Sequence, residues 1–347
     1  MSPTTVANLT WAGHKFPTRP NGFWNDLVSS HAGTAPRVGL TPKGRRRELA
    51  HRRGKGEEPG EHVRSSVPMG PTSSIVVKKR LALVLDCDGT IADDTTTQLL
   101  DWLKVDSKEF WAEVKEKEGH GWDGPLVWTQ MLLKAAADHG RPITRALLED
   151  FARNQLAFAP GIPESFAKFQ EFVRRRSREL RIDAVLDSHI LTSGLEDMLA
   201  ATALADMVTS IWGSTLAFDT DGVAIGPKSL LSFTEKTKCL FAINKGVSKA
   251  ALRSEPSSVN LYKPVAARPV PLENMIYIGD GDTDVPCFSI IIHSGGQTIG
   301  IRNPGKSHPS DLRPRWGPYC RDYSDGSDLF YAMSDRLNDI LIRLAER

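Results

Sequence analysis

The chain has 347 residues, which is enough for a large core and for either two domains or one domain with an insertion. Charged residues make up 25% of the chain and hydrophobic residues 40%, as in ordinary globular proteins, and the net charge of +2 is too small to imply a polyanionic partner for the whole molecule. No apolar run is long enough to span a bilayer, so we expect no membrane partner. The four cysteines are scattered without metal-type spacing, and we expect a reduced, cytoplasmic protein. The oligomeric state is not predictable from the sequence.

Residues 1–75 differ in composition from the rest of the chain. They mix Pro, Gly, Ser and Thr with basic clusters such as Arg45-Arg46-Arg47, and they lack apolar periodicity. Such a composition cannot bury enough surface to offset the entropy of ordering, so we predict a disordered basic extension. One alternative is that the native chain starts at Met69. A nucleic-acid-binding arm is the less favoured alternative, because charge runs are usually only solvated.

The first predicted element of the folded part is a buried strand from Leu81 to Leu85. Its continuous apolar run is typical of a parallel strand, and it ends at two aspartates, Asp86 and Asp88. Gly89 then turns the chain. Because open α/β sheets bind their ligands outside the carboxyl ends of the strands, we expect both carboxylates at a functional edge of the sheet.

Residues 95–157 change from a strand period to a helix period. Apolar stripes such as Leu99, Leu100 and Leu103 predict several helices, and the segment is far longer than a simple crossover connection requires. We predict a helical cap over residues 95–157, inserted into an α/β core made of residues 76–94 and 158–347. The alternative is that these helices form a further layer of the core.

After the insertion, a helix begins near Pro163 and a second strand covers His189 to Thr192. The strand ends at Ser193, and a helix from Leu195 to Ala203 is predicted to follow at once. Ser193 would then lie at a strand end and at a helix start, where backbone N–H groups and a hydroxyl can bind an anion. A serine in this position is more often a plain helix cap.

A hairpin over residues 211–224 precedes a helix that opens near Thr234. Lys236 falls in the first turn of this helix, where a cation opposes the helix dipole. A bound phosphate would offset this conflict, although an exposed lysine that reaches solvent is equally compatible with the pattern.

A further apolar strand, Met275 to Gly279, ends at Asp280, and Asp284 follows a glycine turn. Residues 297–301 form another predicted strand, and residues 328–343 a closing amphipathic helix. Strands that alternate with helices imply a parallel sheet, whose carboxyl ends lie along one edge. The polar residues that follow the separate strands can therefore converge there.

Four carboxylates in one place would repel one another, and a hard divalent cation such as Mg²⁺ removes that repulsion. A lysine and a serine hydroxyl are the groups expected around the remaining oxygens of a phosphoryl group. The set therefore predicts phosphoryl transfer.

These segments resemble the four motifs of the haloacid dehalogenase (HAD) superfamily. The matching stretches are Asp-x-Asp-Gly-Thr at 86–90, the hydrophobic-Ser-Gly at 191–194, Lys236, and Gly-Asp-Gly-Asp-Thr-Asp at 279–284. The layout is similar to the phosphoserine-phosphatase-like branch, and the resemblance covers about residues 80 to 347. It implies a Rossmann-like parallel sheet with an inserted α-helical cap.

The resemblance also implies roles for the acidic residues. Asp86 would be the nucleophile that forms an aspartyl-phosphate, and Asp88 the general acid and base. Mg²⁺ would be bound by Asp86, the backbone carbonyl of Asp88 and Asp280, with Asp284 acting through coordinated water.

For phosphate binding, the resemblance implies Ser193 and Lys236. Thr192 and Lys238 are close enough in sequence that the register stays open by one or two positions. Phosphoserine phosphatases usually carry an acidic residue nine positions after the nucleophile, and this chain has Thr95 there, which argues against phosphoserine as the substrate.

The sequence therefore predicts a Mg²⁺-dependent phosphatase that hydrolyses a small phosphomonoester through an aspartyl-phosphate. A phosphotransferase or phosphomutase would use the same motifs. A non-catalytic regulatory protein with a basic nucleic-acid-binding arm is the alternative from another class, and the intact set of Asp86, Asp88, Lys236 and Asp280 argues against it.

Overall fold

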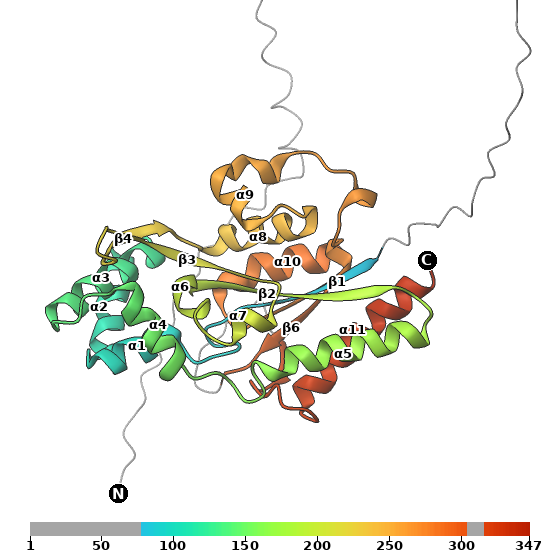
Figure 1. The fold of residues 1–347 in the computed structure, drawn as a ribbon, viewed down its shortest axis with the longest axis horizontal. Helices are drawn as coiled ribbons and strands as arrows, with labels where there is room; N and C mark the ends of the chain where they lie inside the picture. Colours follow the sequence, from blue (N-terminus) through green and yellow to red (C-terminus); the bar gives the residue numbers. More distant parts are fainter. Residues whose placement is uncertain (1–77, 304–315) are drawn as a thin grey trace, which may run out of the picture. The chain divides into compact units, whose positions relative to one another are not determined.

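A computed structural model describes residues 78–303 and 316–347 of the chain (Figure 1). The predictions for residues 1–75, including the disordered basic extension, the start at Met69 and the nucleic-acid-binding arm, lie outside the described residues.

The described residues form an α/β fold around one seven-stranded sheet, in the order β4-β3-β2-β1-β5-β6-β7. All neighbouring strands run parallel except the antiparallel pair of β3 and β4. This confirms the predicted parallel, Rossmann-like sheet. The strands are β1 (Lys79–Leu85), β2 (Ala184–Leu195), β3 (Ser210–Phe218), β4 (Ala224–Ser229), β5 (Met275–Gly279), β6 (Gln297–Ile301) and β7 (Trp316–Tyr319).

Strand β1 lies in the centre of the sheet and is buried on both faces. Leu81, Leu83 and Leu85 point into the hydrophobic cluster on one face, and Ala82 and Val84 into the cluster on the other. All five side chains are fully buried. A strand covered on both faces must be apolar along its whole length, which explains the continuous hydrophobic run in the sequence.

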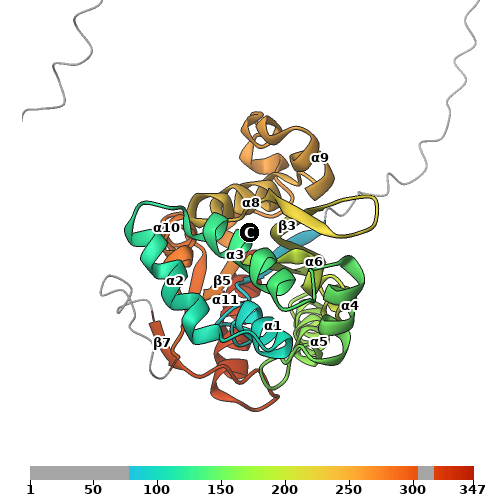
Figure 2. The same ribbon diagram turned by 90° about the vertical axis from the view of Figure 1, so that its left-hand side faces the viewer.

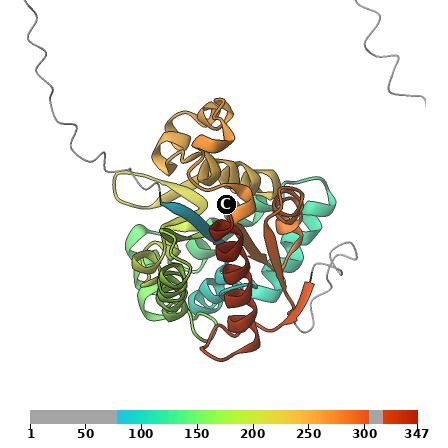
Figure 3. The same cartoon turned by 90° about the vertical axis from the view of Figure 1, so that its right-hand side faces the viewer.

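Helices cover both faces of the sheet, as the end view in Figure 3 shows. Helices α5 (Glu164–Glu179) and α11 (Asp328–Ala345) pack on one face, where the rings of Phe169 and Phe330 stack with centroids 4.6 Å apart. Helices α8 (Phe233–Lys245) and α10 (Val285–His293) pack on the other face. The closing helix and the helix that carries Lys236 are therefore confirmed at their predicted positions.

The predicted helical insertion contains α1 (Thr95–Leu103), α2 (Ser107–Gly119), α3 (Gly124–Asp138) and α4 (Arg145–Asn154). These helices share a hydrophobic cluster with Leu195, Met198 and Leu216 from the sheet side, and they lie in front of the strand ends in Figure 2. A β-bridge joins Thr144 to Val223 at the β3–β4 turn. The insertion thus forms backbone hydrogen bonds with the β3–β4 hairpin. Its boundaries as a cap, residues 95–157, remain a prediction.

Two elements differ from the sequence predictions. The strand predicted over His189 to Thr192 is longer in the structure, where β2 covers Ala184–Leu195. The helix predicted over Leu195 to Ala203 is only one turn, α6 (Glu196–Leu199). The Thr202 hydroxyl donates to the carbonyl of Leu199 and accepts from the N–H of Leu204, and such side-chain bonds compete with helix continuation. The other short elements are α7 (Leu204–Met207), α9 (Lys249–Ser254), and the 3₁₀ turns η1 (Pro256–Asn260), η2 (Val265–Ala267), η3 (Leu272–Asn274) and η4 (Asp282–Asp284).

Within the described residues, no helix is long and apolar enough to cross a membrane. All four cysteines lie in this part of the chain as free thiols, and Cys87, Cys239 and Cys287 are buried. The buried cysteines act as small hydrophobic side chains.

His189 in β2 is a buried titratable group, and we expect it to make the fold sensitive to acid. The ring is buried, Nδ1 lies 2.7 Å from the hydroxyl of Ser210, and Nε2 has no partner among the described residues. Burial lowers the pKa of His189 from 6.5 to about 4. The unfolded chain therefore binds an extra proton between these values, and we expect the free energy of unfolding to fall by about 3 kcal/mol as the pH drops from 6.5 to 4.

Urea unfolding of the wild type and of His189→Gln at pH 7.5 and pH 4.5 measures this contribution. We expect the variant to lose distinctly less stability than the wild type over this interval. Equal losses in the two proteins would show that His189 is not the group that charges on unfolding.

Candidate active site

Three aspartates meet at the carboxyl edge of the central strands. Asp86 directly follows β1 and Asp280 directly follows β5, and the two strands are neighbours. The backbone N–H of Asp86 donates to the carbonyl of Ile278 (2.8 Å), which continues the pairing to the end of β1. Asp86, Asp280 and Asp284 each offer one oxygen within 4.8 Å of the others, and all three are buried. The structure therefore brings these predicted residues together.

Lys236 enters this cluster from α8. Its side chain is fully buried, and Nζ lies 2.9 Å from Oδ1 of Asp86 and 2.8 Å from Oδ1 of Asp284. It also donates to the hydroxyl of Thr283 (3.0 Å). The sequence left two explanations open for a lysine in the first turn of this helix, a bound phosphate or an exposed side chain, and the burial of Lys236 excludes the second. In the structure two carboxylates supply the offsetting negative charge.

The cluster holds more negative than positive charge. Burial, followed by the charge of Asp284, raises the pKa of Asp86 well above its usual range. Burial alone would lower the pKa of Lys236, but the charges of Asp284 and Asp86 outweigh it and raise that pKa. One ammonium group thus faces three carboxylates in a dry environment, an imbalance that a bound cation would relieve.

Asp284 is fully engaged by donors from the protein. Oδ1 accepts from Lys236 and from the hydroxyl of Tyr277 (2.7 Å), and Oδ2 accepts from the N–H groups of Asp280 and Gly281, both at 3.1 Å. A carboxylate has about four acceptor positions, so these four donors occupy Asp284. Tyr277 was not singled out from the sequence. The available signal was a phenol in a strand that is otherwise apolar.

The Tyr277→Phe variant tests this arrangement. Only the hydroxyl is lost, since the ring still packs edge-on against Phe288. We expect a loss of about 1 kcal/mol in the free energy of unfolding and, because a partner of the acidic cluster has gone, a divalent-ion affinity about tenfold lower. Urea unfolding and calorimetric titration with Mg²⁺ measure the two effects.

Tyr323→Phe is the matched control, because it also removes a buried phenol hydroxyl, one that donates to the backbone carbonyl of Thr90 (3.2 Å). We expect a similar loss of stability but a smaller change in Mg²⁺ affinity. The same fall in affinity in both variants would contradict a specific role for Tyr277.

Asp280 is held from the other side of the cluster. Asn303 Nδ2 donates to Oδ2 of Asp280 (2.7 Å) and to the carbonyl of Gly89 (2.8 Å), and the Thr90 hydroxyl lies 3.4 Å from Oδ1. Asn303 follows β6 and was not singled out from the sequence. It joins the loop after β1 to the carboxylate after β5, and so fixes their relative positions.

Gly89 is required at its position for two reasons. Its φ is +80°, which disfavours other residues, and a Cβ there would lie 2.1 Å from Oδ2 of Asp280. Gly222 has a nearly identical φ of +79° but open space around it. We expect each alanine variant to lose about 1–2 kcal/mol of stability from the backbone conformation, and Gly89→Ala to lose more because Asp280 must move.

Thermal unfolding and Mg²⁺ titration of the two glycine variants separate these contributions. Gly222→Ala should bind Mg²⁺ as the wild type does, and Gly89→Ala should bind it at least about tenfold more weakly. Wild-type affinity in Gly89→Ala would show that Asp280 need not occupy its observed position.

The carboxylate of Asp88 is not a member of the three-aspartate cluster, and it contacts two threonines instead. Oδ1 accepts from the backbone N–H of Thr95 (2.7 Å), and Oδ2 from the hydroxyl of Thr192 (3.2 Å). Burial, and then the charge of Asp94, raise the pKa of Asp88 to about 6. A carboxyl group with such a pKa exchanges protons more readily near neutral pH than an ordinary aspartate does.

The two hydroxyls at the end of β2 have different surroundings. Thr192 contacts Asp88 and also accepts from the N–H of Gly194 (2.9 Å). The Oγ of Ser193 is buried and has no hydrogen-bond partner among the described residues. Because β2 continues to Leu195, Ser193 is inside the strand and not at a helix start. The structure therefore brings Thr192 to the acidic groups, whereas no hydrogen bond among the described residues links the Ser193 hydroxyl to them.

Lys238, the other register alternative, does not reach the acidic cluster. It pairs with Glu235 on the surface of the same helix. The structure thus selects Lys236 as the lysine of the site.

A cavity of about 500 Å³ opens beside Gly89, between the loop after β1 and the start of α1. This volume suits a small molecule. Arg321 lines the cavity and pairs with Asp93, while the Asp94 side chain accepts from the N–H of Thr97 at the start of α1. The remaining lining residues are Gln98, Asp101 and Asn303.

The donor set fits a hard divalent cation, because all three clustered groups are carboxylates. Asp284 is saturated by protein donors, whereas Asp86 accepts from Lys236 at Oδ1 and Asp280 from the neutral Asn303 and Thr90. Asp86 and Asp280 are therefore better suited than Asp284 to bind a cation directly.

None of the protein-family models compared with the chain matches it. Among curated proteins, an uncharacterized protein of Borreliella burgdorferi is 24% identical over 235 residues, which covers 61% of this chain and 78% of the relative.

Solved structures that resemble the fold include a HAD family hydrolase from Salmonella enterica serovar Typhi, at 13% identity and a TM-score of 0.44, covering 71% of this chain and 69% of that one. A substrate-bound phosphoserine phosphatase has 13% identity and a TM-score of 0.44, covering 74% of this chain and 99% of its own. At these values the likeness supports no inference about activity by itself.

Proposed function

We propose that the protein is a Mg²⁺-dependent phosphatase of the haloacid dehalogenase superfamily that hydrolyses a small phosphomonoester through an aspartyl-phosphate. The observation that carries this proposal is the buried carboxylate of Asp86, held at one oxygen by Lys236 and beside Asp280 at the carboxyl edge of the sheet. A carboxylate that is fixed, dry and close to a permanent cation is suited to attack phosphorus.

In the first step an oxygen of Asp86 forms a bond to phosphorus, and the bond between phosphorus and the ester oxygen breaks. Asp88 gives its proton to the departing alkoxide, which leaves as an alcohol. In the second step water attacks the phosphorus of the aspartyl-phosphate, Asp88 takes a proton from that water, and the bond to Asp86 breaks. Inorganic phosphate leaves, and both aspartates return to their starting states.

The other residues hold charge and orientation. Lys236 offers its ammonium group to the phosphoryl oxygens and to Asp86. Thr192 orients Asp88, and because its hydroxyl lies beside that carboxylate whereas Ser193 forms no such bond, Thr192, the register alternative, is better supported than Ser193 as a phosphate donor. Asp86 and Asp280 would hold Mg²⁺, together with the backbone carbonyl of Asp88. The ion supplies positive charge that offsets the carboxylates and the phosphoryl oxygens.

Asp284 serves the site mainly through its hold on Lys236, with any contact to Mg²⁺ made through water. Its four protein donors support this role. The proposed ligand set therefore keeps Asp284 in an outer position.

The environment of Thr95 does not favour phosphoserine as the substrate. Thr95 is buried and its N–H is used by Asp88, so it offers no charge to a substrate amine. The nearby acids are engaged as well, since Asp94 caps α1 and Asp93 pairs with Arg321. The cavity beside Gly89 has a volume that suits a small molecule.

Phosphate release from a panel of phosphomonoesters, with Mg²⁺ or with EDTA, tests the proposal. We expect release that requires Mg²⁺ and that differs among panel members according to the leaving group. Adding alcohols as acceptors separates a hydrolase from a phosphotransferase, because a transferase would form new esters at the expense of free phosphate. No release and no new ester from a folded protein that binds Mg²⁺ would contradict the proposed activity.

A further inference from the structure

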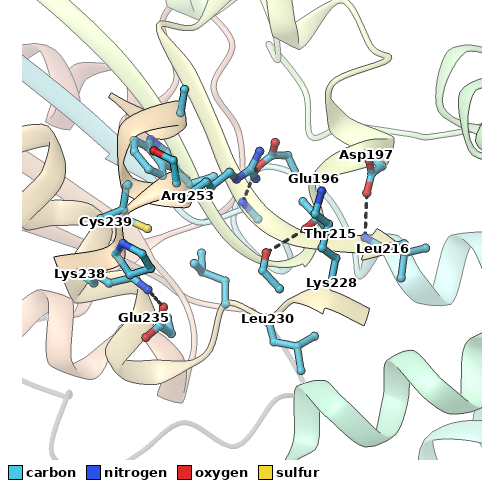
Figure 4. A pocket seen from close by; sticks show the side chains of 18 of the residues that line it. Glu196, Asp197, Thr215, Leu216, Lys228, Leu230, Glu235, Lys238, Cys239 and Arg253 are labelled. Atoms are coloured by element: carbon cyan, nitrogen blue, oxygen red, sulfur yellow. Dashed lines mark hydrogen bonds and ion pairs between the residues drawn. The ribbon is translucent and has the colours of Figure 1, made fainter. Parts of the chain in front are cut away.

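A second cavity of about 600 Å³ lies beside the active site but contains none of its residues. It is bounded by the β3–β4 hairpin, α6, the first half of α8, and α9 (Figure 4). Part of its wall is apolar, with the buried side chains of Trp212, Leu216, Leu231 and Leu252. The volume is within the range of small-molecule sites in proteins, and such sites combine an apolar wall with a few polar groups.

Charged side chains of both signs line this cavity, with one more cation than carboxylate: Arg145, Lys228, Lys238 and Arg253 against Glu196, Asp197 and Glu235. The buried carboxylate of Glu196 accepts from Arg253 (2.7 Å), from Lys249 (2.9 Å) and from the N–H of Gly213 (3.0 Å). Two cations therefore share the Glu196 carboxylate, and of these Arg253 lines the cavity. A guanidinium group has five N–H donors, and the Arg253 side chain remains 45% exposed. Arg253 thus keeps donors for a ligand after its bond to Glu196 is made.

Further cations line the rest of the cavity. Lys228 at the end of β4 is exposed and forms no ion pair within the part of the chain that the structure describes. Lys238 has a carboxylate partner in Glu235. Lys228 comes from β4 and Arg253 from α9 (Figure 4), so a bound ligand can meet positive charge from two elements.

We infer that this cavity is a binding site for a small organic anion, in which Arg253 and Lys228 bind a carboxylate, sulfonate or phosphate group and the Trp212 and Leu216 wall holds an apolar body. Arg253 can bind a planar or tetrahedral anion through two N–H groups, while Lys228 acts as a point charge. The apolar wall selects for an organic ligand over an inorganic ion.

The cavity and the active site share one helix. From α8, Lys236 points to the aspartate cluster while Lys238 and Cys239 line the cavity. The site is nevertheless separate from the proposed phosphatase centre, and its test needs no enzymatic activity. Failure of the proposed function and failure of this inference are therefore distinguishable.

A pair of dyes tests the inference directly on the full chain. The probe 1-anilinonaphthalene-8-sulfonate has an anionic group on an apolar body, and N-phenyl-1-naphthylamine is the same body without the charge. Fluorescence titration should show that the sulfonate binds at least about fivefold more tightly than the neutral dye, because only the sulfonate reaches the cations. Equal affinities would overturn the inference.

Variants then locate the bound dye. Lys228→Gln and Arg253→Gln should each weaken sulfonate binding by about three- to fivefold and leave the neutral dye unaffected. Arg253→Gln keeps Glu196 paired with Lys249, so the fold should survive. Lys168→Gln on α5 removes an exposed charge of the same kind at the opposite face of the sheet, and it should change nothing.

A steric variant completes the test. Ala250→Trp places a bulky group at an exposed position that lines the cavity, and it should weaken the binding of both dyes. Sulfonate binding that is the same in the wild type, Lys228→Gln, Arg253→Gln and Ala250→Trp would place the dye elsewhere and overturn the inference.

Discussion

The Asp86→Asn variant is expected to release phosphate at least about 10³-fold more slowly than the wild type, because the attacking oxygen is lost. Its stability should not fall with its activity. Burial and the charge of Asp284 raise the pKa of Asp86, so the ionised carboxylate lowers the stability of the folded protein. A neutral amide removes one of three crowded negative charges, and Lys236 keeps its contact with Asp284. We expect thermal unfolding at the wild-type temperature or slightly above it.

Asp187→Asn is the matched control for this prediction. Asp187 is also buried, but it forms a two-point ion pair with Arg80, at 2.8 and 2.7 Å, away from the acidic cluster. This variant should lose stability and retain phosphate release, the reverse of the Asp86→Asn pattern. Full activity in Asp86→Asn, or a loss of activity that merely follows unfolding, would contradict the role proposed for Asp86.

The Lys236→Met variant is expected to lose about 3–5 kcal/mol of stability, because it leaves buried carboxylates without their cation. Lys236 is the ion-pair partner of both Asp86 and Asp284, and its side chain has no exposed surface. Urea unfolding at neutral pH measures the loss. Phosphate release should be lost as well, since the ammonium group is proposed to bind the phosphoryl oxygens.

A second substitution separates the electrostatic cause from simple loss of packing. Adding Asp284→Asn to Lys236→Met removes one of the stranded charges, so we expect at least about 1 kcal/mol of stability to return without any return of activity. Lys249→Met is the control, because its partner Glu196 keeps Arg253, and it should lose less stability. No recovery in the double variant would show that the cost is not electrostatic.

The sheet and the acidic residues at its edge were predictable because buried parallel strands have an unmistakable pattern. Continuous apolar runs located β1 and β5, and the carboxylates that end them lie where the topology of a parallel sheet requires. The lysine was predictable for a different reason. Its position at the start of α8 conflicts with the helix dipole, and the partners that resolve the conflict are Asp86 and Asp284.

The partners of these groups were not predictable, because they depend on contacts between distant segments. Asn303 donates to Asp280 and to the carbonyl of Gly89, which lies more than two hundred residues earlier in the chain. No local sequence pattern identifies Asn303 as a residue of the site. The residues on either side of Tyr277 in β5 are apolar, so the sequence predicts an ordinary core residue. Only the structure shows that its hydroxyl donates to Asp284.

Element ends were the other source of error. The sequence placed a strand end at Ser193, whereas β2 continues to Leu195 and the following helix has only one turn. As a consequence Thr192, and not Ser193, contacts Asp88. A shift of one residue along a strand exchanges the side chains of its two faces, so the end of an element decides which hydroxyl reaches a site.

The most direct test of the proposed mechanism is to trap the covalent intermediate. We would mix the protein with Mg²⁺ and p-nitrophenyl phosphate, quench during turnover, reduce with borohydride and map the peptides by mass spectrometry. Borohydride converts an aspartyl-phosphate to homoserine, so the proposal predicts homoserine at position 86 and none in the Asp86→Asn variant. Sustained phosphate release with an unmodified Asp86, or with the modification on another residue, would contradict it.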